Sequence, residues 1–545
     1  MNTSRQVCLY LFEPHTIQPY IFETGRLAEM VGASELLEDL LGRPLNDTLK
    51  AVCPAVSEDD FLRKGGASFI VMMEDRAQAE RLRDIWGLVV ARNAPGLKFG
   101  HCVAEASSVP KALEQGRQRL QELRNISRPE LPAAGPLVIR APRTGRPAVK
   151  LKEVKKKRQE WLDQDTLKKR GHRKGKSLAG RFFHDPDLAL NEFAFPLNME
   201  QDEANAFPFA SDNRYVAVVH IDGNGLGEIL LELGRKLAGQ QDDRQAADIF
   251  RHFSRSLQEA TETAARRALS DTILQDPLCA DLPVGSDGKK RLPFRPLVLG
   301  GDDLTAIVRA DFALDFSRSF IGHFEEESAA RLESIGSGQV PRTLTGCGGI
   351  AFVKAHQPFR LAYDLAESLC SYAKDAARRH RKQGEPIPSC LAMHRVTTSF
   401  ITDYATAREE EMRRQAAAAA RYFTLGVYGA GRHAQDFPPL EALIGLKELF
   451  REPEMARGPL RHYLTLAHVS PGDAKHHYQR WLRNLKKRFP VHYTRYLDLA
   501  DRLIPGCGTS DLPMRTSGSR EAPVEETFIG DLTHLLAVEG EAHDR

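Results

Sequence analysis

The sequence has no hydrophobic run of membrane-spanning length, no paired-cysteine motif and no large excess of charge. Its apolar runs, such as residues 216–221, are far shorter than the roughly 20 residues that a membrane-spanning helix needs. The N-terminal residues lack the basic and apolar segments of a secretory signal. The eight cysteines are scattered without a CxxC pair, which argues against a zinc ribbon or a disulfide framework. We therefore expect a cytoplasmic protein with no zinc and no membrane partner.

Charge and length set further bounds. Lys and Arg number 76 against 73 Asp and Glu, which leaves a formal net charge of +3. A surface for nucleic acid must therefore be local, because the chain as a whole is not a polycation. The 545 residues, 42% of them hydrophobic, suffice for about three or four folded units.

Composition and hydrophobic periodicity divide the chain into five parts. Two segments alternate strand-like and helix-like patterns, which is typical of α+β units. The expected parts are an α+β unit over residues 1–128, a basic Pro/Gly-rich linker or insertion over 129–212, a second α+β unit over 213–395, a helical domain over 396–505 and a polar tail over 506–545.

The two α+β units repeat one order of parts: a Gly-Gly turn, a strand, a helix, a strand and a helix. The first copy reads GGASFIV from Gly65, and the second reads GGDDLTAIV from Gly300. The first copy has alanine and serine where the second has Asp302 and Asp303. The repeat predicts that the second copy could hold a metal ion and that the first could not.

Three aspartates are candidates for a metal site. Asp222 ends the apolar strand YVAVVHID, and Asp302 and Asp303 lie in the turn between two other apolar strands. If the strands are neighbours, the three carboxylates meet at one sheet edge. Mg²⁺ or Mn²⁺ prefers such oxygen ligands, and two such ions can activate a hydroxyl and neutralise a leaving pyrophosphate.

Glycines accompany these aspartates. Gly300 and Gly301 allow the tight turn, and Gly223 and Gly225 leave room for a triphosphate near main-chain N–H groups. Asp after Gly-Gly is also ordinary turn chemistry, so the motif alone is weak. The apolar flanks and the upstream Asp222 favour the catalytic interpretation.

GGDD, IDGNGLG and the segment GIAFVKAHQPFRLAYDLAESLCSYAKDAARR together resemble the second palm domain of the large polymerase-like subunit of type III CRISPR effector complexes. That family is related to the GGDEF and class III nucleotidyl cyclases. PYIFETGRLAEMVGASELLEDLL, GGAS, APGLKF and TGRPAV resemble its degenerate first palm and the segment after it. The resemblance implies an α+β fold with two ferredoxin-like palm domains followed by an α-helical C-terminal domain.

The resemblance also implies roles for individual residues. Asp222, Asp302 and Asp303 would be catalytic and would bind metal, and Lys374 would meet the triphosphate. Lys374 is equally consistent with a solvated residue on an amphipathic helix. The family often has a second acidic residue where this chain has Asn224, so metal affinity or activity could differ. The implied nucleotide-binding residues are Gly223, Asn224, Gly225, Gly300, Gly301 and Lys374.

Two features of the family are missing. The family's large subunit usually begins with an HD nuclease domain, whereas this chain starts at the first palm. The pair His184–Asp185 has no obvious partner histidines, and no zinc module joins the palms. We therefore do not expect DNA cleavage at an HD site.

Our leading hypothesis is a nucleotidyl cyclase or nucleotidyltransferase with a two-metal mechanism. It would use ATP, release pyrophosphate and make a cyclic mono- or oligoadenylate as a signal in antiviral defence. The alternative is a catalytically inactive scaffold that binds guide or target RNA and other effector-complex subunits. A free-standing cyclase controlled by another partner, and a homo-oligomer, are also open.

Two basic segments lie outside the motif. In residues 150–176, clustered cations and Trp161 could follow a nucleic-acid backbone, although we favour a solvated, flexible insertion. The cations that would test this are Lys155, Lys156, Lys157, Lys168 and Lys169. In residues 480–489 the pattern predicts a helix with its apolar residues inward and its cations outward.

Overall fold

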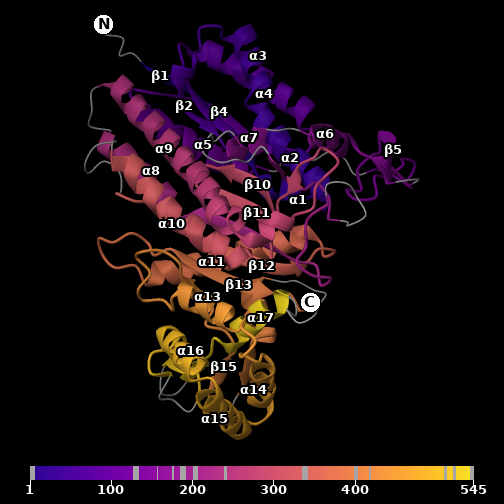
Figure 1. Ribbon diagram of the computed structural model, residues 1–545. Helices are drawn as coiled ribbons and strands as arrows, with labels where there is room; N and C mark the ends of the chain where they lie inside the picture. Colours follow the sequence, from indigo (N-terminus) through magenta and orange to yellow (C-terminus); the bar gives the residue numbers. More distant parts are fainter. Residues whose placement is uncertain are drawn as a thin grey trace.

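The computed structural model shows three parts arranged from top to bottom in Figure 1: an N-terminal unit, a central unit and a helical region. We use these names for residues 7–124, 215–395 and 440–503. The structure describes all residues except 1–5, 127–133, 156–157, 175–176, 184–191, 200–205, 238–241, 334–341, 398–402, 416–418, 508–511, 519–522 and 540–545.

The N-terminal unit contains a four-stranded antiparallel sheet in the order β2-β3-β1-β4. This order and the helices between the strands make it ferredoxin-like. Apolar residues of β1 are buried almost throughout, because the strand lies in the interior of the sheet. The elements are β1 (Val7–His15), α1 (Ile17–Phe22), α2 (Leu27–Leu40), α3 (Arg43–Val52), β2 (Phe61–Gly65), β3 (Ser68–Met73), α4 (Arg76–Asn93), β4 (Lys98–Ala106) and α5 (Val109–Arg124).

The central unit repeats this topology in a six-stranded sheet, β10-β11-β8-β12-β13-β16. Its first four strands have the order of the N-terminal sheet, so the predicted internal repeat is present. The strand β8 is an apolar run buried on both faces. The strand β16 (Val427–Gly429) comes from beyond residue 395 and adds the sixth strand to the sheet. The elements of the unit itself are β8 (Tyr215–Gly223), α8 (Leu226–Leu237), α9 (Asp243–Leu269), β10 (Phe294–Gly300), β11 (Asp303–Arg309), α10 (Ala313–Leu332), β12 (Gly346–Lys354), α11 (Phe359–Arg379) and β13 (Cys390–Arg395).

Each of the two units packs one of its helices against an edge strand of the other. Helix α9 of the central unit packs against β2, and α2 of the N-terminal unit packs against β10. Ser34 Oγ in α2 donates a hydrogen bond to the Leu297 carbonyl at 2.5 Å. Two hydrophobic cores run through both units, so the units form one packed body whose Gly-Gly hairpins face each other.

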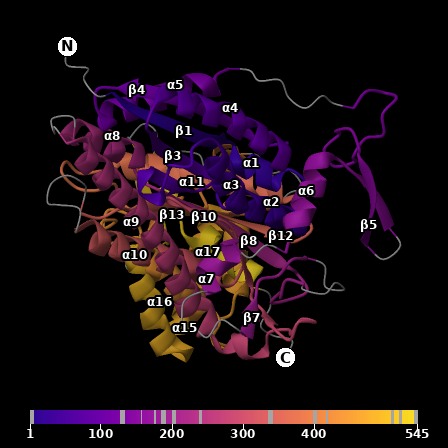
Figure 2. The same cartoon turned by 90° about the horizontal axis from the view of Figure 1, so that it is seen from above.

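The insertion between the units is more ordered than its composition suggests. The ribbon of β5 (Lys150–Lys155) and β6 (Arg158–Leu162) projects from the side of the molecule (Figure 2). Helices α6 (Gln164–His172) and α7 (Ser177–Phe183) contact α2, so this part packs on the N-terminal unit. Two short strands, β7 (Phe193–Ala194) and β9 (Lys290–Arg291), pair farther along.

Lys169 is a correction to the proposed nucleic-acid contacts of the insertion. Its side chain is fully buried, with Nζ 2.6 Å from Asp165 Oδ2 and 2.9 Å from Glu23 Oε2. An aspartate one helical turn earlier neutralises it inside the protein, so it cannot reach a phosphate. Trp161 is 37% exposed. Lys156, Lys157 and the pair His184–Asp185 lie outside the described residues.

The C-terminal part is helical, with a small added sheet. The elements are α12 (Tyr404–Glu410), β14 (Arg413–Gln415), β15 (Ala420–Tyr422), α13 (Leu440–Leu449), α14 (Gly458–Val469), α15 (Pro471–Arg488), α16 (Pro490–Leu503), β17 (Arg515–Gly518), β18 (Pro523–Glu526) and α17 (Ile529–Val538). The segment after residue 505 differs from the expected polar tail. Its strand β18 pairs with β15, and α17 contributes Leu532, Leu535 and Leu536 to the core.

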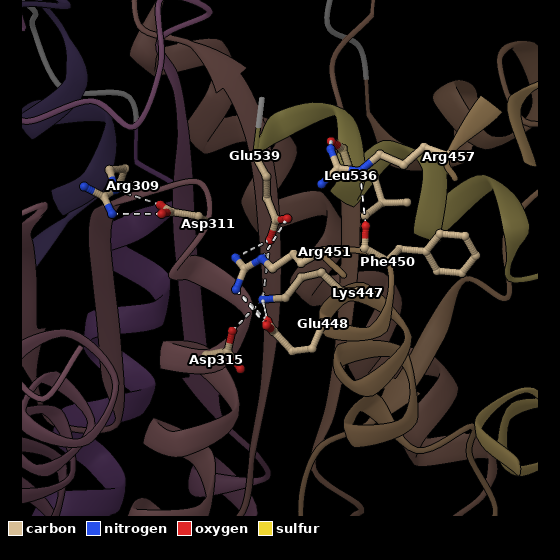
Figure 3. Close-up of polar contacts among 10 residues, drawn as sticks. All are labelled: Arg309, Asp311, Asp315, Lys447, Glu448, Phe450, Arg451, Arg457, Leu536 and Glu539. Atoms are coloured by element: carbon tan, nitrogen blue, oxygen red, sulfur yellow. Dashed lines mark hydrogen bonds and ion pairs between the residues drawn. The ribbon is translucent and has the colours of Figure 1, made fainter. Parts of the chain in front are cut away.

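A buried ion-pair network joins the central unit to the helical region (Figure 3). Lys447 of α13 is 2% exposed, and its Nζ lies 2.6 Å from Asp315 Oδ2 of α10. Arg451 binds Glu539, just beyond α17, at 2.7 Å. These contacts fix α13 and the end of α17 against α10.

The eight cysteines are all buried and free, as expected for a chain without a disulfide framework. Within the described part of the chain, no helix is both long enough and apolar enough to cross a bilayer.

Candidate active site

The structure brings the three candidate aspartates together at one edge of the central sheet. Asp222 lies near the end of β8, and Asp303 is the first residue of β11. The antiparallel register places Asp303 directly opposite Asp222, where Cα atoms are roughly 4.5–5.5 Å apart. Asp302 occupies the turn immediately before β11. Residues 80 positions apart in sequence thus form one acidic cluster.

The turn that presents Asp302 has strict backbone requirements. Gly300 pairs with Asp303, so Gly301 and Asp302 form a two-residue hairpin loop. The φ of Gly301 is +63°, which suits the first central position of a type II′ turn and favours glycine. A Cβ on Gly300 would lie 3.3 Å from Gly66 Cα. The two Gly-Gly hairpins therefore touch, and the N-terminal unit supports the acidic turn.

Gly223 is required for close packing against Asp302. A Cβ on Gly223 would lie 2.6 Å from both Cβ and Oδ2 of Asp302, too close for any side chain. The Gly223 N–H donates a hydrogen bond to the Asp302 carbonyl at 3.2 Å. Gly225 has a φ of +68° directly before α8. These glycines position the aspartates, and a role in triphosphate binding remains a prediction.

Lys374 of α11 provides a cation inside the cluster. Its Nζ forms an ion pair with Asp222 Oδ2 and donates to the Gly223 carbonyl at 2.9 Å. Burial lowers the pKa of Lys374, but the charge and hydrogen bond of Asp222 outweigh burial, so the pKa is raised overall. The side chain is 14% exposed. In this structure Lys374 is thus an ordered member of the cluster, in contrast to the solvated alternative.

One cation is too little for three carboxylates. Burial is the main cause that raises the pKa of Asp302 to about 6, and repulsion from Asp222 is the second. Burial, together with repulsion from Asp222 and from Asp302, raises the pKa of Asp303 well above its usual value. The Oδ1 atom of Asp303 is buried and accepts no hydrogen bond. His220 Nδ1 lies 3.8 Å away, but burial lowers the pKa of His220 to about 4, so that ring is neutral at pH 7. The donor set therefore fits a divalent cation.

Asn224 is turned into the protein. Its side-chain nitrogen donates to Thr345 Oγ1 at 3.1 Å and to the Pro388 carbonyl at 3.3 Å. The residue is 8% exposed. These hydrogen bonds connect the start of α8 to the segments before β12 and β13. Metal ligation by the Asn224 side-chain carbonyl stays a prediction.

Two residues of the N-terminal unit reach the acidic turn and were not predicted. Gln18 Nε2 in α1 donates to Asp303 Oδ2 at 3.0 Å. The Arg63 guanidinium attracts Asp302 and works against the rise in its pKa. For Arg63 the sequence offers an indication, because alignment of the two Gly-Gly turns places this cation opposite the apolar Val298. Gln18 had none, because α1 gives no motif.

Two cavities lie where the units meet. A cavity of about 140 Å³ is lined by residues of α1, α2 and both hairpins, including Gln18, Arg63, Asp302 and Asp303. A second cavity of about 250 Å³ lies on the side of the GGAS hairpin, between α5, α8 and α9, and Arg63 and Arg117 are among its lining residues. Each hairpin therefore has a cavity that both units line.

Both units thus have the ferredoxin-like strand order of a palm domain, and the acidic cluster lies at the sheet edge of the second unit. Residues 215–382 match the family model of the second palm domain of Cas10/Cmr2. This segment is therefore similar to the second palm domain of Cas10/Cmr2, and the resemblance inferred from GGDD and IDGNGLG is confirmed for it. None of the curated proteins matches the sequence.

The solved structures to which this chain is similar include three that contain Csm1. One is a Csm1–Csm4 cassette in complex with cA4, with 12% identity, 99% of this chain and 70% of that chain covered, and a TM-score of 0.46. Another is Csm1 in T. onnurineus, with 12% identity, 98% and 69% covered, and a TM-score of 0.46. A third is a Csm1–Csm4 subcomplex of a type III-A CRISPR-Csm interference complex, with 11% identity, the same coverage and a TM-score of 0.47.

Proposed function

We propose that this protein is a metal-dependent nucleotidyltransferase of the cyclase type. It makes a cyclic oligoadenylate-type signal from ATP, with release of pyrophosphate, in CRISPR-like antiviral defence. The observation that supports this best is the acidic cluster of Asp222, Asp302 and Asp303 inside a Cas10-type palm, where a buried carboxylate oxygen has no hydrogen-bond donor.

Asp222 and Asp303, with Asp302 as a further ligand, would hold Mg²⁺ or Mn²⁺. When bound, such ions lower the pKa of an attacking hydroxyl and neutralise the charge of the leaving pyrophosphate. The side chains of this chain position the reactants. Gln18 orients Asp303, and Lys374 supplies a compact positive charge beside Asp222 that suits a triphosphate.

The two cavities support a reaction between two nucleotides. In our proposal the cavity at GGDD takes part in binding the nucleotide that is attacked, and the cavity at GGAS holds the nucleotide that supplies the 3′-hydroxyl. The 3′-oxygen forms a bond to the α-phosphorus as the bond to pyrophosphate breaks. The protein contributes mainly by holding the two groups in line.

Partners and place in the cell follow from the same proposal. A nucleoside triphosphate is the substrate, and guide or target RNA and other effector-complex subunits are the expected partners. A cytoplasmic location is expected for such a complex.

Incubation of the purified protein with each labelled nucleoside triphosphate and Mg²⁺ or Mn²⁺, with products resolved by mass, tests the activity. We expect a pyrophosphate-releasing product from ATP, and none from the variant Asp302→Ala/Asp303→Ala. The adjacent aspartates Asp59 and Asp60, which precede β2 at the end opposite its hairpin, offer a matched control, Asp59→Ala/Asp60→Ala, which should retain activity.

The scaffold alternative is favoured by one observation, the buried amide of Asn224 where the family often has an acid. If the unmodified protein forms no product with any nucleotide, even with RNA added, the scaffold function replaces the proposed one. Asn224→Asp would then be the variant to test for restored activity.

A further inference from the structure

The charge of the chain is distributed unevenly. Residues 457–495 contain nine lysines and arginines and one acidic residue, Asp473, which gives a formal charge of +8. Because the whole chain carries +3, the remaining residues together carry −5. The excess positive charge falls on α14, α15 and α16, at the end of the molecule opposite the N-terminal unit (Figure 1).

Helix α15 concentrates this charge on its outer side. Tyr478, Trp481 and Leu485 are buried, and they turn one side of the helix toward the core. The exposed cations of the same helix, which we call the α15 cations, are Arg480, Arg483, Lys486, Lys487 and Arg488. The apolar residues fix how the helix is rotated, and the cations therefore cannot turn inward.

The α15 cations have no ion pair with any described carboxylate. Lys486 Nζ lies over the Tyr493 ring, 5.6 Å from its centroid, and Arg483 donates only to the Gln479 carbonyl. Cations nearby behave differently, since Arg495 pairs with Glu452 at 2.6 Å and Arg451 pairs with Glu448 at 2.8 Å. Five uncompensated charges on two helical turns repel one another. Such a face gains free energy when an external polyanion covers it.

We propose that the α15 cations bind the phosphate backbone of a nucleic-acid strand. Arg480, Arg483 and Lys487 lie three and four residues apart, so they follow one stripe along the helix with a rise of roughly 4.5–6 Å between neighbours. Such a row suits successive phosphates. The core of a protein–protein interface is depleted in charged residues and enriched in aromatic ones, whereas the aromatic residue of this stretch, Trp481, faces inward. The chemistry therefore favours nucleic acid over a protein partner.

The position of the surface separates it from the proposed catalysis. Helix α15 packs against α14 and α16, whereas the acidic cluster lies between the central and N-terminal units. A strand bound at α15 is thus a partner rather than the reacting nucleotide. The proposal holds whether or not the palm is active, because binding is measured without catalysis.

Fluorescence anisotropy of the full chain tests this surface. The probes are a labelled 30-nucleotide single-stranded RNA of mixed sequence and a DNA of the same sequence, each titrated at several KCl concentrations. The variant replaces all five α15 cations by glutamine. We expect it to bind at least tenfold more weakly than the unmodified protein. The slope of log K against log[KCl] should become less steep by about 3.5, because each of five neutralised phosphates of a single strand contributes roughly 0.7 to it.

A control variant carries the same change of net charge on cations that already have carboxylate partners. Its substitutions to glutamine are at Arg43, Arg76, Arg83, Lys236 and Arg378. It should retain the affinity of the unmodified protein. Thermal unfolding of both variants verifies folding, and Lys486→Arg/Lys487→Arg should bind like the unmodified chain.

Four results overturn the proposal. One is binding of neither RNA nor DNA by the unmodified protein, and another is unchanged affinity of the variant that lacks the α15 cations. A third is an equal loss of affinity in both glutamine variants, which would indicate only a general charge effect. Equal binding of a labelled polyglutamate of matched charge would assign the surface to an acidic protein segment. Tighter binding of RNA than DNA, or the reverse, identifies which nucleic acid the surface prefers.

Discussion

Gln18 shows how a single residue of the N-terminal unit can influence chemistry in the central unit. It donates to Asp303 from a helix 285 positions away in sequence. Donors that hold metal-binding carboxylates set the orientation of the ligand, and their loss typically costs 10- to 100-fold in metal affinity. Gln18 is therefore a positioning residue in the proposed site.

We expect Gln18→Ala to weaken Mn²⁺ binding by roughly tenfold and to lower activity with it. Isothermal titration with Mn²⁺ measures the first effect independently of turnover. Gln118→Ala, on the exposed side of α5, is the matched control. Unchanged Mn²⁺ affinity in Gln18→Ala would show that the hydrogen bond to Asp303 has no part in cation binding.

Gly223 makes a second prediction at the scale of a residue. A methyl group at this position would clash with Cβ and Oδ2 of Asp302, so Gly223→Ala should displace that carboxylate. We expect loss of both product formation and Mn²⁺ binding. Gly234→Ala, in α8 with open space around its Cα, should instead be neutral or stabilising by about 0.5–1 kcal/mol. Normal Mn²⁺ binding by Gly223→Ala would contradict this account.

At the scale of an element, α17 is held in place by a buried acid. Asp531 accepts hydrogen bonds from the Tyr428 hydroxyl at 2.5 Å and from the Leu425 N–H at 2.9 Å. Burial raises the pKa of Asp531 to about 6, although these hydrogen bonds work in the other direction. A polar tail was expected here because charged residues flank this apolar helix in the sequence.

The raised pKa predicts a pH dependence of stability. The folded state holds the Asp531 proton more tightly than the unfolded state does. The stabilising contribution is therefore complete below about pH 4 and is lost as the pH rises through 6. The contribution of Asp531 to the free energy of unfolding is about 3 kcal/mol, because its pKa rises from 3.8 to about 6. Asp531→Asn does not titrate, so the free energy of unfolding of the unmodified protein should fall relative to this variant between pH 4 and 7. A difference independent of pH in denaturant titrations would rule this out.

At the scale of the whole molecule, buried charges connect the helical region to the central unit. Lys447 is almost fully buried beside Asp315, Glu448 and Glu539. Burial lowers the pKa of Lys447, but the neighbouring acids outweigh it and the pKa is raised overall. The region with the α15 cations is thereby attached to the unit with the acidic cluster.

Replacing Lys447 by alanine leaves Asp315 without its cation, whereas Glu448 and Glu539 keep Arg451. We expect the free energy of unfolding to fall by about 3–5 kcal/mol, measured by denaturant titration or as a lower melting temperature. Lys447→Met/Asp315→Asn should recover part of the loss, because it removes the charge on both sides. Lys236→Met, on the surface of α8, should change stability by no more than about 0.5 kcal/mol. A small effect of Lys447→Ala would mean that the network does not join the two parts.

The sequence by itself indicated two α+β units with one order of parts and a tight turn that holds Asp302 and Asp303, because strand patterns and turn requirements are local. The ferredoxin-like arrangement of the units was implied by the family resemblance. The meeting of Asp222 with the turn depended on the pairing of β8 with β11, which the structure shows. The expected domain boundaries remain predictions.

Only the tertiary structure decided which distant residues complete the site. Gln18 and Arg63 reach the acidic turn because the two units pack with their hairpins touching, and no local pattern specifies that packing. Lys169 likewise looks like a solvated cation in the sequence, but the fold buries it between Asp165 of its own helix and Glu23 at the end of α1. The physical reason is that burial and electrostatic partners depend on neighbours brought close by the fold, whereas sequence patterns report only the preferences of each segment.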